Sequence, residues 1–146
     1  MVGLPALPPF WALGWHASSK KYSNMTNFQE NIQGYADAKI PLEGVWLDNS
    51  YMENYTDFSV NNTAFPGLVN YTNELKKQNK RMIVVVDAGL SADDVDNKYF
   101  KKALTKNALI MSSINDSEES FEGVLVSHVY SNKTVFLDFF SDDSAD

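Results

Sequence analysis

The chain has 146 residues, the size of one ordinary domain, and 44% of them are hydrophobic, which suits a globular fold. Nineteen acidic against twelve basic side chains give a net charge of −7, which argues against nucleic acid or an anionic membrane surface as a partner. The sequence has no cysteine, which rules out disulfides and cysteine nucleophiles, and no apolar run of the roughly 18 residues that a membrane span needs.

The first forty residues predict a strand followed by a helix. The aromatic run at residues 10–15 (FWALGW) follows two prolines, and we expect a short buried strand there. Thr26 and Gln29 have the spacing of a capping box, which predicts a helix start. The helix should end before Pro41, and its apolar face is formed by Phe28, Ile32, Tyr35 and Ala36.

Two further strands and a second helix follow. Residues 44–48 (GVWLD) form a compact apolar run that ends in a carboxylate, and Pro66 then opens a helical pattern. Residues 82–86 are continuously apolar and are followed by Asp87, as in a strand that is covered on both faces of a parallel sheet. The order of elements is therefore βαβαβ.

Beyond Asp87 the pattern changes. Ser91 and Asp94 are candidate caps for a short helix, and three strand-like runs follow it, at residues 108–113, 123–130 and 134–140. An acidic segment at residues 115–122 separates the first two runs, which predicts an inserted antiparallel hairpin. The chain reads as one continuous unit, because no linker or repeat divides it.

Three carboxylates are the main candidates for chemistry. Asp48, Asp87 and Asp138 each follow an apolar strand, and ligands gather at the carboxyl ends of strands in α/β folds. A carboxylate there can accept hydrogen bonds from sugar hydroxyls or stabilise an oxocarbenium-like transition state. The alternative is that each aspartate caps its own following turn.

Aromatic residues near the first two predicted strand ends could wall a sugar pocket. The candidate pocket residues are Trp11, His16 and Trp46, and the alternative for each is an ordinary structural role. His128 has no companion with metal-ligand spacing, so no metal site is predicted. The sequence also lacks GxGxxG, Walker, HExxH and GxSxG motifs, which leaves nucleotide chemistry without support.

Six of the fourteen asparagines lie in N-x-[ST] sequons, which indicates a secretory or lysosomal history. These candidate N-glycosylation sites are Asn24, Asn54, Asn61, Asn70, Asn115 and Asn132. The first ten residues have neither the basic region nor the apolar region of a signal peptide, so we expect none within these residues. An Asn-, Ser- and Thr-rich proteome is the alternative explanation.

Four segments in this order resemble glycoside hydrolase family 31, the α-glucosidases that include lysosomal acid α-glucosidase and sucrase-isomaltase. They are residues 7–16 (LPPFWALGWH), 40–52 (IPLEGVWLDNSYM) with Asp57 and Phe58 after it, 81–91 (RMIVVVDAGLS) and 134–140 (TVFLDFF). The resemblance implies a (β/α)₈ TIM barrel that hydrolyses α-glucosidic bonds with retention through two carboxyl groups and without a cofactor.

The resemblance also implies roles for single residues. Asp48 matches an aspartate that binds the sugar in the −1 subsite, Val85 matches a position that lines this subsite, and Tyr130 matches an aromatic wall. Asp87 matches an aspartate of the third strand, near the pocket. The family's nucleophile follows its fourth strand in a W-x-D-M-N-E type motif, which these residues do not contain, so no catalytic residue is assigned.

A closed barrel needs about 250 residues. Residues 1–146 are therefore expected to form the N-terminal portion of the catalytic domain, a partial barrel of three βα units with the inserted hairpin, which needs the remainder of the barrel to complete the fold and is inactive alone. Two alternatives stay open. One is a noncatalytic or degenerate carbohydrate-binding protein, favoured by Ser50 where an aspartate is usual, and the other is an unrelated doubly wound domain.

Overall fold

The computed structural model describes residues 3–93, 97–112, 120–121, 123–129 and 131–142. The chain forms two compact units. Unit 1 comprises Met1–Tyr51 and Val60–Val85, and unit 2 comprises Met52–Ser59 and Val86–Asp146. Each unit has its own sheet structure and its own buried residues, and each is described by itself.

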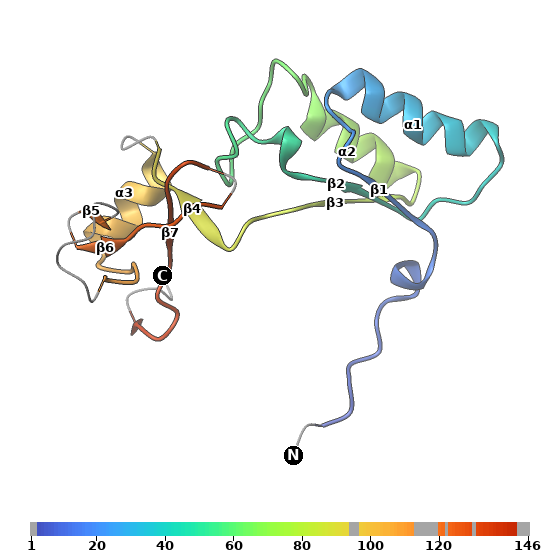
Figure 1. The fold of residues 1–146 in the computed structure, drawn as a ribbon. Helices are drawn as coiled ribbons and strands as arrows, with labels where there is room; N and C mark the ends of the chain where they lie inside the picture. Colours follow the sequence, from blue (N-terminus) through green and yellow to red (C-terminus); the bar gives the residue numbers. More distant parts are fainter. Residues whose placement is uncertain (1–2, 94–96, 113–119, 122, 130, 143–146) are drawn as a thin grey trace. The chain divides into compact units, whose positions relative to one another are not determined.

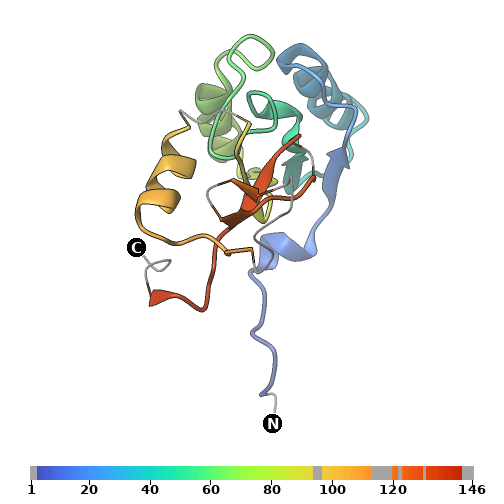
Figure 2. The same ribbon diagram turned by 60° about the vertical axis from the view of Figure 1, so that its left-hand side comes forward.

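Unit 1 contains a three-stranded parallel sheet of β1 (His16–Ser19), β2 (Gly44–Leu47) and β3 (Arg81–Val84), in that spatial order. Helix α1 (Met25–Asp37) connects β1 to β2, and helix α2 (Leu68–Lys77) connects β2 to β3. Figures 1 and 2 show both helices on the same face of this sheet. Parallel neighbours require such crossovers, because the chain must return to the starting edge of the sheet.

The core of unit 1 lies between the sheet and its helices. Val45 and Leu47 of β2 are completely buried, whereas Trp46 between them is 38% exposed. Side chains alternate across a strand, so Val45 and Leu47 face the helices and Trp46 faces the open side of the sheet. Phe28 of α1 and Leu75 of α2 complete this core at 0% and 1% exposure. Of the apolar face predicted for α1, Phe28 and Ile32 are buried and Tyr35 is half-buried, whereas Ala36 is exposed.

The first predicted strand is wrong. Residues 10–15 do not pair in the sheet: Phe10–Leu13 is a 3₁₀ helix, η1, and Phe10 is 91% exposed. The strand is the following segment, β1, in which Ala17 packs against the core at 4% exposure. The prediction placed the strand in the aromatic run because β1 (HASS) has little strand propensity of its own. β1 forms through its pairing with β2.

Strand β3 begins one residue earlier and ends two residues earlier than the pattern of residues 82–86 predicts. The expectation that this strand is covered on both faces also differs from the structure, since Val84 is 37% exposed. Within the described residues β3 pairs with β2 along one edge and lies at the border of the sheet.

Unit 2 is built from short antiparallel pairs and one helix. Strand β4 (Gly89–Ser91) pairs with β7 (Thr134–Phe136), β5 (Ser120–Phe121) pairs with β6 (Val124–Leu125), and α3 spans Lys98–Thr105. The buried cluster of this unit comprises Ala92, Phe100, Ala103, Leu109, Val124, Val126 and Val135.

The strands predicted in unit 2 are much shorter in the structure, and β4 was not predicted. Of the predicted run at residues 108–113, residues 108–112 are described and contribute only single bridges, at Leu109 and at Met111, which pairs with Val124. Ser91 is not a helix cap but part of β4, and α3 is capped by Asn97, whose side chain accepts from the Tyr99 amide at 2.9 Å. The alternative cap Asp94 and most of the predicted turn at 115–122 lie outside the described residues.

The described helices share one way of ending. At the end of α1, the Lys39 amide donates to Ala36 O (3.0 Å) and the Ile40 amide to Tyr35 O (2.9 Å), with Lys39 in the left-handed region at φ 57°. The same pair of bonds closes α2 at Asn79 and α3 at Asn107. This is the Schellman arrangement, here built without glycine.

Helix α1 begins with a different cap from the predicted capping box. The N-cap is Asn24, and its Oδ1 accepts from the Asn27 amide at 2.8 Å. Thr26 and Gln29 lie inside the helix. Asparagine is a strong N-cap residue, and the extended backbone at Asn24 is the conformation that such a cap requires.

Candidate functional site

The carboxyl edge of the sheet in unit 1 brings two predicted site residues together. Asp48 directly follows β2 and Val85 directly follows β3, and the Val85 amide donates to Leu47 O at 3.0 Å, which continues the parallel pairing. By alternation both side chains lie on the same face as Trp46, the face without helices. The structure therefore places a carboxylate beside an apolar side chain at the end of a parallel sheet, where α/β proteins bind ligands.

The segment just after Asp48 holds the carboxyl ends of β2 and β3 together. Asp48 Oδ1 accepts from the Asn49 amide (2.8 Å), and this is the one hydrogen bond of its side chain within the described residues. A short 3₁₀ helix, η2 (Asn49–Tyr51), follows and buries Tyr51, whose hydroxyl donates to Val85 O at 2.9 Å. Tyr51 thus holds the ends of β2 and β3 in register. The local turn uses Oδ1 of Asp48, and within the described residues no hydrogen bond to Oδ2 is found.

Three other predicted pocket residues contact one another. Trp46 Nε1 donates to His16 Nδ1 at 3.0 Å, and His16 Nε2 lies 3.2 Å from Trp11 O, which can only accept. The Trp11 and His16 rings are stacked with centroids 5.7 Å apart. Both nitrogens of His16 are thereby used, which defines its tautomer with the proton on Nε2.

The position of this cluster corrects the prediction for His16. It is the first residue of β1, rather than a residue after a strand end, and it pairs with Gly44, the first residue of β2. Asp48, just after β2, lies four residues beyond Gly44, which corresponds to ~13 Å of extended chain. In barrel folds the amino end of the sheet serves stability and the carboxyl end serves function. His16, with Trp11 stacked on it, therefore lies at the amino end of the sheet, and a pocket role for either residue stays a prediction.

Unit 2 contains a buried carboxylate that sequence reasoning did not single out as a site residue. Asp57 is only 3% exposed, and its Oδ1 accepts from the Asp87 amide at 2.9 Å. Burial raises the pKa of Asp57 and the nearby Asp87 charge raises it too, while the hydrogen bond from the Asp87 amide opposes them. The available signal was the Asp57-Phe58 pair in the family resemblance, but the contact itself joins residues 30 positions apart.

Asp87 and Asp57 line a narrow cavity in unit 2 together with Ser91 and Thr134. Asp138, the third predicted strand-end carboxylate, accepts from the Phe140 amide at 3.0 Å, which is the turn-capping role left open as the alternative. Tyr130, the predicted aromatic wall, lies outside the described residues.

The sequon asparagines differ in their surroundings. Asn24 caps α1, and Asn61 Oδ1 accepts from the Thr63 and Ala64 amides at 3.1 and 2.9 Å. Asn24, Asn54, Asn70 and Asn132 are exposed, and Asn61 is half-buried. Asn115 lies outside the described residues.

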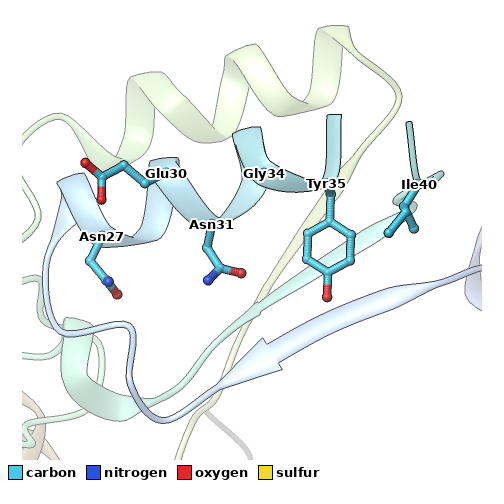
Figure 3. Close-up of a pocket in the computed structure, with 6 residues that line it drawn as sticks. All are labelled: Asn27, Glu30, Asn31, Gly34, Tyr35 and Ile40. Atoms are coloured by element: carbon cyan, nitrogen blue, oxygen red, sulfur yellow. The ribbon is translucent and has the colours of Figure 1, made fainter. Parts of the chain in front are cut away.

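A surface depression of unit 1 lies along α1, away from the strand ends. It has a volume of about 500 Å³ and is lined by Asn27, Glu30, Asn31, Gly34, Tyr35 and Ile40. Figure 3 shows Asn31 and Tyr35 projecting from the same side of the helix. The depression is shallow and open, and Gly34 contributes no side chain to it, so its shape gives no indication of a specific ligand.

The described residues show neither a metal-binding cluster nor a helix that could span a membrane. No group of three or more His, Asp or Glu side chains is arranged to hold a metal ion there. None of the described helices has the length and apolar character needed to cross a bilayer.

A family model, the glycosyl hydrolases family 31 TIM-barrel domain, matches residues 5–146. The chain therefore belongs to glycoside hydrolase family 31, as the resemblance implied. Members of this family are glycosidases that hydrolyse O-glycosyl bonds, and the parallel sheet with its helices fits a part of such a barrel.

Among curated proteins, the chain is similar to an alpha-glucosidase of Schizosaccharomyces pombe, with 28% identity over 152 residues that cover 99% of this chain and 15% of that protein. It is also 31% identical over 114 residues to alpha-xylosidase 1 of Arabidopsis thaliana, which covers 75% of this chain and 12% of that protein. The chain thus spans less than a sixth of the length of these relatives.

Solved structures agree on the fold. The crystal structure of the ER glucosidase II heterodimeric complex matches with a TM-score of 0.80 at 12% identity, covering 92% of this chain and 14% of that one. A family 31 dextranase of Flavobacterium johnsoniae matches with a TM-score of 0.77 at 20% identity, covering 98% of this chain and 17% of that one.

Proposed function

We propose that this chain contributes the substrate-binding edge of a retaining α-glucosidase. The observation that carries the proposal is Asp48, placed beside Val85 at the carboxyl edge of a parallel sheet in a family 31 chain. Its carboxylate would accept hydrogen bonds from hydroxyl groups of the sugar in the −1 subsite, and Val85 would line the apolar side of that subsite. The alpha-glucosidase relatives support an α-glucoside as the substrate.

Hydrolysis requires two further carboxyl groups, about 5 to 5.5 Å apart in a retaining enzyme. We assign neither of them to residues 1–146, because the nucleophile motif of the family does not occur here. The proposal places them in other strands of the same barrel, which these residues need in order to complete the fold. This division is in keeping with the small share of the relatives that the chain covers. The mechanism needs no cofactor.

Asp87 and Tyr130 are proposed as further substrate contacts, on the resemblance alone. The secretory pathway is the proposed location, lysosomal or extracellular at its end point. Its support is the excess of sequons together with the names of relatives such as an intestinal sucrase-isomaltase of Suncus murinus and ER glucosidase II. The proposed N-glycosylation sites are Asn24, Asn54, Asn61, Asn70, Asn115 and Asn132.

One observation bears on the alternative of a noncatalytic sugar-binding protein. Ser50, which stands where the family usually has an aspartate, donates its hydroxyl to Tyr22 O at 2.5 Å. An ionised carboxylate cannot donate such a bond. Residue 50 is therefore committed to local structure in this chain, and the subsite has one carboxylate fewer than the family pattern.

The test is a kinetic comparison in the full protein that contains these residues. The substrates are p-nitrophenyl α-glucoside, maltose and p-nitrophenyl α-xyloside, and the variants are Asp48→Asn and Asp37→Asn. Asp37 is exposed at the end of α1 and serves as the matched control. We expect Asp48→Asn to lower kcat/KM for the α-glucosides at least a hundredfold, and Asp37→Asn to leave it unchanged.

Three other outcomes have definite meanings. A preference for the xyloside would change the proposed substrate from an α-glucoside to an α-xyloside, the substrate class that the name of one relative indicates. Binding of maltose without turnover by the unmodified protein would establish the noncatalytic alternative. Equal activity of Asp48→Asn and the unmodified protein would remove Asp48 from the site.

A further inference from the structure

The loop at residues 52–59 of unit 2 has an unusual backbone conformation. Three of its non-glycine residues have positive φ: Asn54 (48°), Tyr55 (56°) and Phe58 (62°). The left-handed region crowds the Cβ atom, and residues other than glycine stay there only where the surrounding contacts over-determine the conformation. The loop must therefore be held in place by contacts of its own.

Those contacts are present. The Thr56 amide donates to Glu53 O at 2.9 Å, and the Glu53 amide donates to Ser59 Oγ at 2.9 Å, which closes the loop on itself. The Phe58 ring packs on Tyr99 of α3, with centroids 4.9 Å apart. These contacts involve residues that precede Asp57 and residues that follow it in the sequence.

The side chain that this loop buries is a carboxylate. Asp57 is 3% exposed, yet the hydrogen bond that its side chain accepts in the described structure comes from a main-chain amide, that of Asp87. A buried carboxylate is costly, and an asparagine could accept the same bond without the charge. A charged acceptor makes a stronger bond to an amide than a neutral one. A need for a strong hydrogen bond to the Asp87 amide would explain why a carboxylate is buried here.

The amide that donates this bond belongs to the segment that connects β3 to β4. Asp87 lies between Val84, the last residue of β3, and Gly89, the first residue of β4. The backbone direction at Asp87 decides where its own carboxylate points. Gly89, which follows Asp87 by two residues, is tightly packed against β7. A Cβ there would lie 2.3 Å from Thr134 Cγ2 and 3.1 Å from Val135 O.

We propose that Asp57 is a positioning residue that fixes the main chain at Asp87 and so directs the Asp87 carboxylate. This rests on the proposed function insofar as Asp87 is taken to contact the sugar. Asp57 itself touches no substrate in this arrangement, and it acts through the Asp87 amide. The strained loop serves to hold its carboxylate in place.

The first measurement is independent of activity. Hydrogen exchange of the segment 86–91 is followed by mass spectrometry in the full protein, for Asp57→Ala, Asp57→Asn and the control Glu53→Gln. We expect exchange at least tenfold faster in Asp57→Ala, a smaller acceleration in Asp57→Asn, which keeps an acceptor, and none in Glu53→Gln. If Asp57→Ala does not fold, Asp57→Asn decides alone. Unchanged exchange in the folded Asp57 variants would overturn the proposal.

The second measurement is a double-mutant cycle on kcat/KM with Asp87→Ala. If Asp57 acts through Asp87, Asp57→Ala lowers kcat/KM about tenfold, mainly through KM, and has no further effect once Asp87 is removed. Independent, multiplicative effects would overturn the positioning role. A protein whose exchange responds as expected but which cleaves no glycoside would refute the proposed function and leave the link between Asp57 and Asp87 standing.

Discussion

The sharpest test of the sheet geometry in unit 1 is a comparison of two glycine-to-alanine changes. A Cβ at Gly44 would lie 2.6 Å from His16 Nδ1, 2.8 Å from Cε1 and 2.9 Å from Cγ. These atoms belong to a ring that is held from both sides, by Trp46 Nε1 and by Trp11 O. The methyl group of Gly44→Ala therefore fits only if the ring leaves its place.

The expected cost of Gly44→Ala follows from these contacts. Displacing the ring gives up two hydrogen bonds of about 0.5–1.5 kcal/mol each, and keeping it imposes overpacking of ~1–3 kcal/mol. Either way the free energy of unfolding should fall by about 1–3 kcal/mol. Gly34 is the matched control, because it lies inside α1 and a Cβ there meets nothing within 4 Å. Gly34→Ala should raise the free energy of unfolding by about 0.5–1 kcal/mol, through helix propensity.

The assay is urea unfolding of both variants followed by far-ultraviolet circular dichroism. The two changes add the same atoms to the same residue type, so the reasoning predicts opposite shifts of the midpoint. Near-ultraviolet circular dichroism should change for Gly44→Ala alone, since only that variant disturbs the Trp46 indole. Equal midpoints for the two variants, or a stabilised Gly44→Ala, would refute the packing of His16 over Gly44.

Three further predictions follow from other parts of the chain. Phe28→Ala should lower the free energy of unfolding by about 3–5 kcal/mol in urea, because the ring is completely buried and meets Tyr22 and Tyr71 edge-on; a loss below 1 kcal/mol would contradict this packing. Burial raises the pKa of Asp57 above that of the unfolded chain, so stability is lost as the pH rises from the unfolded value through the folded one. Asp57→Asn removes that loss, and its stability relative to the unmodified protein should be greater at pH 7 than at pH 4, whereas a difference independent of pH would count against it. Asn70 is exposed in α2 within a sequon, so a protein secreted from a eukaryotic host should lose one glycan in Asn70→Gln, detected as a mass difference that glycan removal abolishes.

The parts of unit 1 that sequence reasoning predicted are those with a local signal. The run at residues 44–48 gave β2 and the position of Asp48 at its end, because a compact apolar segment bounded by polar residues has few alternatives. Helices α1 and α2 followed from the spacing of Phe28 and Ile32 and from Pro66, although the cap of α1 moved to Asn24. Amphipathic periodicity identifies a helix more reliably than its ends.

The parts that could not be predicted depend on contacts between distant residues. β1 forms because His16 to Ser19 pair with β2, and nothing in HASS itself favours a strand over the aromatic run before it. The His16 and Trp46 pair joins residues 30 positions apart, as does the Asp57 and Asp87 pair. The short strands of unit 2 are defined by their partners across the sheet, so a single run such as residues 108–113 does not determine whether it becomes a strand.

The way in which α1 and α2 end has a consequence for how this family could vary. Lys39 and Asn79 occupy a conformation that glycine adopts more cheaply, and each lies on the connection that leads into the amino end of the next strand. A substitution to glycine at Lys39 or Asn79 could therefore relieve backbone strain at the amino side of the sheet. Asp48 and Val85 lie at the carboxyl side. A change at Lys39 or Asn79 should therefore alter stability and leave the proposed sugar-binding edge at Asp48 and Val85 in place.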